Sequence, residues 1–230
     1  MTERLVDSPA DPFGRSDHDW IQTFRGRQFW PLAPRAGEVF LDDIAHHLAH
    51  QCRFTGAVRV FYSVAQHSVL VSLQAPVGAD PLWGLLHDAA EAYLVDVARP
   101  VKHSPAFATY REAEARLMGV ICDRFGLPQE EPAWVKLADN ALLMTERRDL
   151  MAPPPRPWSP GPAPLADLIE PWSPYLAEAR FLARFAELNG ATAKTPVACL
   201  GCSTGVLSSK LGGMCGDVEL GIGCPNEAKP

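Results

Sequence analysis

The stretch LLHDAAEAYLVDVARP, residues 85–100, decides how the chain folds. Its apolar residues recur at the spacing of a helix that packs into a core. The same run carries four polar residues, and burying such groups without partners costs several kcal/mol. Those residues are His87, Asp88, Glu91 and Asp96. In a helix the first three lie about one turn apart, so their polar heads would converge. The pattern therefore predicts a buried helix whose polar groups have partners.

Similar patterns on both sides predict further helices. Ser63 followed three residues later by Gln66 is a capping-box pattern. Pro81 suits the first turn of the quoted helix, and Arg99-Pro100 are expected to end it. Strand patterns are scarce, so we expect an all-α fold. The expected helices cover residues 42–54, 63–75, 81–98, 105–125, 132–150 and 173–189.

Composition divides the chain into three parts. Residues 1–40 are rich in turn-forming residues and predict an irregular N-terminal arm. Residues 41–190 carry the helical patterns and predict one domain. Within it, seven of the thirteen residues in 152–164 are proline, which excludes a helix and favours an extended connection. Residues 191–230 are rich in Gly, Ser and Cys and predict a separate, poorly structured tail.

Charge and hydropathy exclude several classes of protein. The net charge is −6, from 21 Lys and Arg against 27 Asp and Glu, and no basic run tracks a phosphate backbone. We therefore expect no polymeric nucleic acid as a partner. No apolar stretch approaches the ~18 residues that span a bilayer, and the first residues lack a signal-peptide pattern. We expect no membrane partner and a cytoplasmic location, where Cys52 and Cys122 are small core residues.

Two further polar residues lie on apolar helix faces far from the quoted stretch. His67 and Asp139 each have apolar neighbours three or four positions away on both sides. Taken singly, each of them could simply be a core residue with hydrogen-bond partners. Together with the quoted stretch they bring imidazoles and carboxylates from three helices, which is what one metal ion needs. The candidate ligands are His67, His87, Asp88 and Asp139.

Other motifs favour simpler explanations. A second His-Asp pair, His18-Asp19, lies in a polar stretch and indicates a solvated loop. His46, His47 and His50 follow two aspartates, and we favour a packed or solvated helix face there over a second metal site.

Four cysteines lie in the predicted tail and leave two alternatives open. Four thiolates could bind zinc, but the second half lacks a paired CxxC, and the composition is equally that of a flexible tail. The cysteines are Cys199, Cys202, Cys215 and Cys224. Because the last helical pattern ends at Asn189-Gly190, we expect catalysis not to need residues 191–230.

The order of the candidate ligands resembles the H…HD…D signature of HD-domain metal phosphohydrolases. The segments VAQHSVLV, HDAAEAYLVDVARPVK and LADNALLMTERRDL are similar to those of the bacterial 5′-deoxynucleotidase branch and its phage-encoded relatives, some of which are dATP triphosphohydrolases. The likeness covers roughly residues 24–190, and matches at several separated places are more specific than one dipeptide. It implies an HD-domain helical bundle.

The resemblance also implies roles for individual residues. The four candidate ligands would hold a divalent transition metal, Mn, Co, Zn or Fe. Glu91 matches the catalytic acid or base, Asp96 the carboxylate that contacts the deoxyribose, and Arg53 the arginine that contacts phosphate. Lys102 could assist, and Phe54 stands where the nucleotidases carry Trp, at a position that contacts the substrate. Multi-metal relatives would allow a second ion near Glu91 and Asp96, and the family suggests a homodimer.

The implied activity is the hydrolysis of deoxynucleoside 5′-monophosphates to deoxynucleosides and phosphate. The alternative is a dNTP triphosphohydrolase, of the dATP type, which releases tripolyphosphate. An alternative of another class is an HD module that binds a nucleotide without turnover. The ppGpp hydrolases carry HDxxED, whereas Ala92 follows Glu91 here, and the GYP motif of cyclic-dinucleotide phosphodiesterases is missing.

Overall fold

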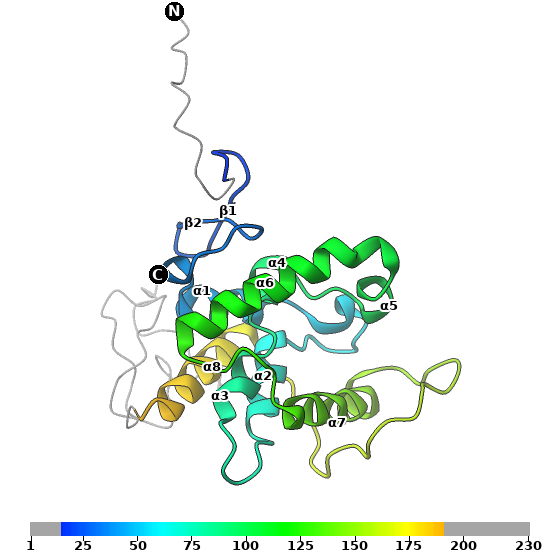
Figure 1. Ribbon diagram of the computed structural model, residues 1–230. Helices are drawn as coiled ribbons and strands as arrows, with labels where there is room; N and C mark the ends of the chain where they lie inside the picture. Colours follow the sequence, from blue (N-terminus) through cyan, green and yellow to red (C-terminus); the bar gives the residue numbers. More distant parts are fainter. Residues whose placement is uncertain (1–14, 191–230) are drawn as a thin grey trace, which may run out of the picture. The chain divides into compact units, whose positions relative to one another are not determined.

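The structure, a computed structural model, describes residues 15–190 and is mainly helical, which confirms the all-α expectation (Figure 1). The chain divides into two units, Met1–Phe181 and Leu182–Pro230, and the division falls inside the last helix. All residues of the sites below belong to the first unit. Among residues 15–190 no helix is both long enough and apolar enough to cross a membrane.

Eight α-helices are seen in the described part of the chain. They are α1 (Leu41–His50), α2 (Val64–Ser72), α3 (Pro81–Leu86), α4 (Glu91–Leu94), α5 (Arg99–Lys102), α6 (Ala108–Phe125), α7 (Ala133–Leu150) and α8 (Pro174–Leu188). Short 3-10 turns are η1 (Ala36–Glu38), η2 (Arg53–Gly56) and η3 (Pro105–Phe107). One antiparallel pair of two-residue strands, β1 (Ile21–Gln22) and β2 (Gln28–Phe29), precedes them.

Helix α2 is the central element of the helical domain. It packs against α1, α3 and α7, and residues 64–69 are all buried. A helix surrounded on all sides is usually apolar all round, but α2 also buries the polar residues Gln66, His67, Ser68 and Ser72. The approach of α3 is close, because a Cβ added at Gly84 would lie 3.0 Å from Ser72 Cα. Polar residues of α2 are therefore held in a rigid interior.

The predicted cap of α2 is only half of a capping box. The Ser63 side chain accepts a hydrogen bond from Gln66 N, as expected at an N-cap. The Gln66 side chain turns away instead: its Nε2 donates to Glu170 O at 2.8 Å, and its Oε1 accepts from Trp172 N at 2.8 Å. Gln66 thus anchors the segment that follows the proline-rich connection, and that connection has no helix, as predicted.

The single helix predicted over residues 81–98 is wrong. Helix α3 ends at Leu86, residues 87–90 form turns, and α4 covers only four residues. Arg99-Pro100 begin α5 instead of ending a helix. In the turns Glu91 N bonds to Asp88 O, three residues back, at 2.9 Å. Such tighter winding eclipses side chains three apart, so Asp88 and Glu91 point the same way.

The helix predicted over residues 42–54 is shorter than expected. Helix α1 ends at His50, and Cys52 pairs with Ser63 in an isolated bridge, where it is half-buried. Cys122 is buried in α6, as predicted for a core residue. Before α1, Phe29 is fully buried and its ring stacks on that of Tyr93 at 3.9 Å between centroids. The described part of the N-terminal arm therefore packs on the helices.

Candidate active site

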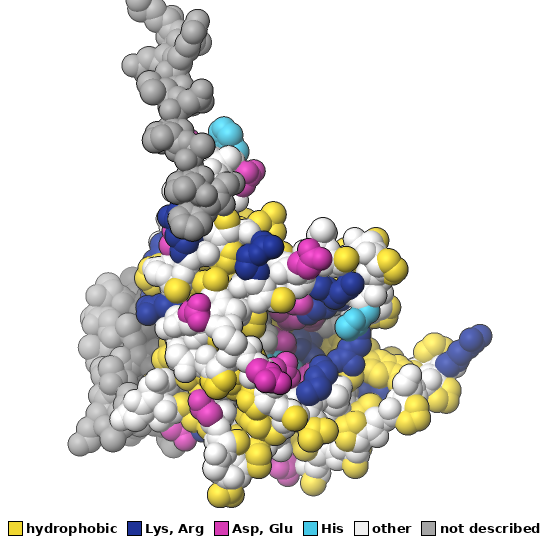
Figure 2. Space-filling model, viewed as in Figure 1, with side chains coloured by type: hydrophobic (Ala, Val, Ile, Leu, Met, Phe, Trp, Pro, Cys, Tyr) yellow, Lys and Arg dark blue, Asp and Glu magenta, His cyan; other side chains and the backbone are white. Residues whose placement is uncertain are grey.

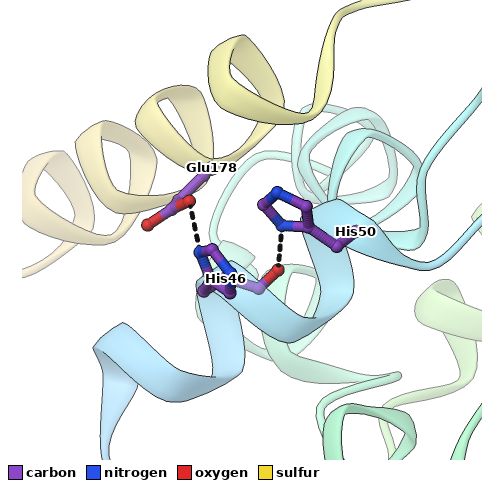
Figure 3. Close-up of side chains that lie close together, drawn as sticks. All are labelled: His46, His50 and Glu178. Atoms are coloured by element: carbon purple, nitrogen blue, oxygen red, sulfur yellow. Dashed lines mark hydrogen bonds and ion pairs between the residues drawn. The ribbon is translucent and has the colours of Figure 1, made fainter. Parts of the chain in front are cut away.

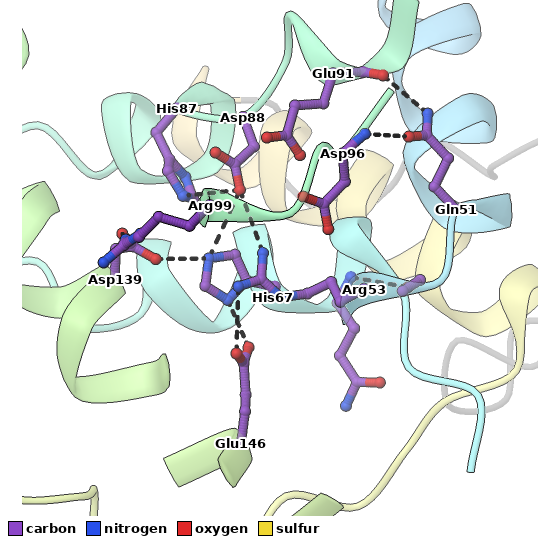
Figure 4. A network of polar contacts seen from close by, with 12 residues as sticks. Gln51, Arg53, His67, His87, Asp88, Glu91, Asp96, Arg99, Asp139 and Glu146 are labelled. Carbon is purple, nitrogen blue, oxygen red and sulfur yellow. Dashed lines mark hydrogen bonds and ion pairs between the residues drawn. The ribbon is translucent and has the colours of Figure 1, made fainter. Parts of the chain in front are cut away.

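His67 lies in the second turn of α2 with no exposed surface. Its Nδ1 donates to the carboxylate Oε1 of Glu146 at 2.7 Å. Its Nε2 points the other way, 3.4 Å from Asp139 Oδ1 and 3.7 Å from Asp88 Oδ2 (Figure 4). Because the carboxylate of Glu146 accepts the proton at Nδ1, the lone pair of the ring faces the two aspartates at Nε2 whenever the ring is neutral.

His87 follows the last residue of α3 and is oriented in the same way. Its Nδ1 donates to Gly84 O at 2.8 Å, a carbonyl that can only accept. Its Nε2 lies 3.2 Å from Asp88 Oδ2, and its ring centroid is 5.2 Å from that of His67. Two imidazoles thus present bare Nε2 atoms to the same aspartate.

These side chains are positioned to hold a metal ion. One nitrogen each of His67 and His87 and one oxygen of Asp88 lie within 4.8 Å of one another. Both Nε2 atoms are buried without a hydrogen-bond partner, which native interiors rarely tolerate. Asp139, on α7, stands outside this trio but reaches His67 Nε2. The predicted ligand set therefore meets in space, and its orphaned nitrogens fit a metal.

Glu146, on α7, belongs to the cluster and was missed by sequence reasoning. It has no exposed surface, and its second oxygen lies 3.3 Å from Arg53 Nη2. Burial would raise the pKa of this carboxyl, but Arg53 and His67 outweigh burial and hold it below its usual range. A signal was present: Glu146 lies two turns after Asp139 on the face that also carries Leu142.

Arg53 is buried at the start of η2, beside the cluster. Its Nη1 lies 3.5 Å from Asp88 Oδ2, and its Nε is buried without a hydrogen-bond partner. The next two residues, Phe54 and Thr55, have left-handed backbones with φ of 56° and 52°. Such conformations cost free energy for residues other than glycine and are often found at functional sites. The guanidinium also lies over the Phe54 ring, 5.3 Å from its centroid, so that ring packs on Arg53.

Glu91 is the first residue of α4, and its side chain turns toward Asp88 and Asp96 (Figure 4). It is 5% exposed, and its Oε2 has no hydrogen-bond partner. Burial, followed by the charges of Asp88 and Asp96, raises the pKa of this carboxyl well above its usual range. Lys102 Nζ, 3.5 Å from Oε1, opposes that rise. The environment of Glu91 thus favours its protonated form, in which a carboxyl can donate a proton.

Asp96 returns to the cluster through a strained residue. Val95 has φ 70° and ψ 150°, a region that a β-branched residue seldom adopts. This reversal after α4 turns Asp96 toward the side where Arg53 lies (Figure 4). Burial is the largest influence on Asp96 and raises the pKa of its carboxyl, against the effect of Arg53.

Gln51, the residue after α1, holds both carboxylate-bearing segments. Its Nε2 donates to Glu91 O at 2.9 Å, and its Oε1 accepts from Asp96 N at 3.2 Å. Both bonds involve backbone groups, so the positions of Glu91 and Asp96 are set relative to α1. This residue, like Glu146, was not singled out in the sequence.

The pKa shifts in the cluster show which of its side chains are charged. Burial would raise the pKa values of Asp88 and Asp139, but the neighbouring histidines outweigh burial and hold both below their usual range. Burial and Arg53 lower the pKa of His67, but Glu146 and Asp139 outweigh them and raise it to about 9. Without an ion the ring therefore carries a proton on Nε2 as well, and a metal bound there would take the place of that proton. The aspartates are thus ionised, which is the state required of a metal ligand.

Basic side chains lie at the edge of the cluster, where Figure 2 shows the surface hollowed between α5 and α7. Lys102, the last residue of α5, has a side chain that is 23% exposed, and its Nζ is 2.5 Å from Glu114 Oε1. Arg99 Nη2 and Lys136 Nζ lie 3.7 Å and 2.8 Å from Asp139 Oδ2, and their side chains are about half exposed. The hollow therefore has cations as well as carboxylates around it.

The remaining sequence motifs lie outside this cluster or add no ligand to it. His18-Asp19 is exposed, as expected of a solvated loop. Among the described residues, neither group positioned to hold a metal includes Glu91 or Asp96, so a second ion beside them has no geometric support there. The four tail cysteines lie outside the described residues.

The sequence is similar to two proteins, in each case over slightly more than half of its length. It is 40% identical over 131 residues to "Uncharacterized protein YfdR" of Escherichia coli, covering 57% of this chain and 72% of the relative. The chain belongs to the same family as YfdR. It is also 38% identical over 130 residues to "Uncharacterized protein RCAP_rcc00048" of Rhodobacter capsulatus, covering 53% of this chain and 66% of that protein. No model of a known protein family matches the sequence.

Proposed function

We propose that the protein is a metal-dependent phosphohydrolase of the HD-domain type that acts on deoxynucleoside 5′-phosphates. One observation carries the proposal: two buried, partnerless Nε2 atoms face ionised aspartates, beside a buried arginine whose Nε is also partnerless. Of the seven such buried side-chain atoms in the described part of the chain, three are these nitrogens and a fourth is Glu91 Oε2. That concentration favours a bound ion and an anionic substrate.

The metal would be held by His67, His87, Asp88 and Asp139. Two imidazole nitrogens and two carboxylate oxygens suit a divalent transition metal and leave coordination positions open. When bound, such an ion supplies Lewis acidity, because it draws charge from phosphoryl oxygens and lowers the pKa of water. Glu146 would fix the orientation of His67, as the Gly84 carbonyl does for His87.

Arg53 would bind the phosphate that reacts. Its guanidinium is held by Glu146 and Asp88 at 3.3 and 3.5 Å, while Nε remains unpaired. A planar guanidinium matches phosphate oxygens and stabilises the charge that builds up as a nucleophile approaches phosphorus. The strained backbone at Phe54 and Thr55 keeps this group in place before substrate arrives.

Glu91 would give a proton to the leaving group. With a monophosphate, the oxygen of a water bonds to phosphorus and the bond from phosphorus to O5′ breaks. The protonated carboxyl of Glu91 donates to O5′, which leaves as the nucleoside hydroxyl. One water proton stays on the phosphate product, and the other restores Glu91. Burial, which raises the pKa of Glu91, favours the protonated form that this role requires.

Asp96 would contact the sugar. No hydrogen bond to its carboxylate is seen in the described part of the chain, so its oxygens are available to the 3′-hydroxyl of a deoxyribose. Lys102 contacts both Glu91 and Glu114, and it would keep the acid in position. Phe54, packed on Arg53, would support the arginine more than it would stack on a base.

A dNTP triphosphohydrolase is the second candidate, and the cations at the edge favour it. Arg99 and Lys136 side chains are 53% and 55% exposed and both face Asp139. They could exchange that contact for the outer phosphates of a triphosphate. In that reaction the water attacks the same α-phosphorus and tripolyphosphate leaves. Lys136→Ala would then lower kcat/KM for a dNTP and leave the value for a dNMP unchanged.

The first experiment is a screen of dNMPs and dNTPs with Mn²⁺, Co²⁺, Zn²⁺ or Mg²⁺, with phosphate and tripolyphosphate measured separately. Turnover of a monophosphate to phosphate supports the first candidate, and tripolyphosphate supports the second. Binding of nucleotides without any turnover, in protein with full metal occupancy, contradicts both. It would favour an HD module that only binds its ligand.

Two conservative variants then separate the roles of the carboxylates. Glu91→Gln keeps the shape but carries no acidic proton, so kcat should fall by ~10²–10⁴ with metal retained. Asp96→Asn should mainly lower kcat/KM and weaken the preference for deoxyribose over ribose. Glu112→Gln, at an exposed position of α6, is the matched control. Near-wild-type turnover by Glu91→Gln would show that Glu91 is not the acid. That the protein forms a homodimer stays a prediction, which size-exclusion chromatography can test.

A further inference from the structure

A second group of metal-binding side chains lies where α1 meets the start of α8. His46 and His50 are one turn apart on α1, and Glu178 faces them from α8 (Figure 3). All three belong to the first unit of the chain. The side chain of Glu178 is 7% exposed, that of His46 is 22% exposed, and His50 is exposed. The group thus has a buried carboxylate and an open side.

The hydrogen bonds define which atoms are available. His46 Nδ1 donates to Glu178 Oε2 at 2.9 Å. His50 Nδ1 donates to His46 O at 2.8 Å, and because a carbonyl can only accept, the Nε2 of the neutral His50 ring is bare. The two rings stack with centroids 4.0 Å apart, so their nitrogens are already close. The other oxygen of Glu178 has no contact with either ring in Figure 3.

His47, between these two histidines, shows what a structural histidine looks like in the same helix. Its Nδ1 donates to Ala92 O at 2.7 Å, and its Nε2 accepts from Phe24 N at 3.0 Å. Both nitrogens are engaged by backbone groups. The packed-face prediction is therefore confirmed for His47, whereas His46 contacts the Glu178 carboxylate and His50 bonds to the backbone through Nδ1 alone.

We propose that His46, His50 and Glu178 form a second binding site for a divalent transition metal, distinct from the site around His67. One nitrogen of each ring and one oxygen of Glu178 lie within 4.8 Å of one another. Ligands of one zinc ion, with bonds of about 2.0–2.2 Å, need neighbouring ligand atoms roughly 3.3 Å apart. Because the two rings are stacked, the exposed His50 ring must turn until its Nε2 points at the ion, which takes the place of the proton between His46 and Glu178.

The ion would join two segments far apart in sequence. His46 and Glu178 are 132 positions apart, and their hydrogen bond is exchanged for two metal bonds to the same ion. The exposed ring of His50 leaves room for water as a further ligand. Because a metal that binds only the folded chain stabilises it, zinc should raise the Tm through this site. The inference does not depend on the proposed hydrolysis.

The experiment compares variants of the full chain, because the first metal site and the tail cysteines can bind zinc in all of them. Zinc content is measured by elemental analysis after equilibration with Zn²⁺ and gel filtration. His50→Ala removes an exposed ligand, and Glu178→Gln keeps an oxygen that accepts from His46. His18→Ala, which removes an exposed histidine elsewhere, is the control.

Both site variants should bind one equivalent of zinc less than wild type, or bind it at least ~10-fold more weakly, and should show a smaller zinc-induced rise in Tm. His18→Ala should match wild type. Wild-type zinc content in both site variants would overturn the proposal, and so would the same loss in His18→Ala. His50→Ala decides the matter alone if Glu178→Gln fails to fold in EDTA.

Discussion

Replacing Glu146 by Gln tests the contacts of Glu146 with His67 and Arg53, which were not predicted from the sequence. The substitution keeps the volume of a side chain with no exposed surface. In the wild type, the Glu146 carboxylate lies 2.7 Å from His67 Nδ1 and 3.3 Å from Arg53 Nη2. In the variant, the amide oxygen can still accept from His67 Nδ1, but the amide nitrogen cannot pair with Arg53. One charged contact is lost and the other becomes neutral. Since hydrogen bonds to charged groups contribute about 1.5–3 kcal/mol each, the free energy of unfolding should fall by about 2–4 kcal/mol.

Metal affinity should fall as well, by about 10–100-fold, because Glu146 orients a ligand and raises its basicity. Urea denaturation in EDTA measures the first effect, and a competition titration with a metal chelator measures the second. Glu112→Gln, exposed on α6, controls for the loss of one negative charge. If Glu146→Gln retained both the stability and the metal affinity of wild type, the assignment of Glu146 as the partner of His67 and Arg53 would be refuted.

Three further substitutions test the geometry around this cluster. Asp139→Ala should cost one equivalent of metal by elemental analysis, and unchanged content would remove Asp139 from the ligand set. Gly84→Ala places a Cβ 2.6 Å from Trp134 Cη2, so urea denaturation should show a loss of about 1–3 kcal/mol, whereas Gly37→Ala, with open space around it, should be nearly neutral. Val95→Gly relieves a positive φ at a residue 54% exposed, so its free energy of unfolding should rise by up to about 1 kcal/mol, and a fall of that size would contradict the strain.

The helical class and the meeting of four distant polar residues could be predicted because apolar periodicity places a residue on a helix face. The interruption after Leu86 could not. Over so short a stretch, an α-helix and a series of turns with hydrogen bonds three residues back bury nearly the same residues. The apolar pattern of LLHDAAEAYL is compatible with either conformation. The positive φ of Val95 was equally hidden, because tertiary contacts impose it on a residue that disfavours it.

Glu146 escaped prediction for a different reason. It begins the run ERRD, and a charged run near a helix end is typical of a solvated face. Its buried charge is paired with Arg53, which is 93 positions away and directly precedes the left-handed residues of η2. The same long-range closure places Gln51 beside Glu91 and Asp96. Local patterns locate residues that face the core, but they do not pair them across such distances.

The double contact of Gln51 bears on how this site could diverge over evolution. One amide sets the positions of two backbone segments, so a shorter side chain, as in Gln51→Asn, would displace Glu91 and Asp96 together. Replacing the Asp96 carboxylate alone leaves both backbone bonds intact. With the proposed roles, a lineage could therefore change its sugar preference in single steps at residue 96 while Glu91 stays in place, whereas loss of Gln51 would impair both residues at once.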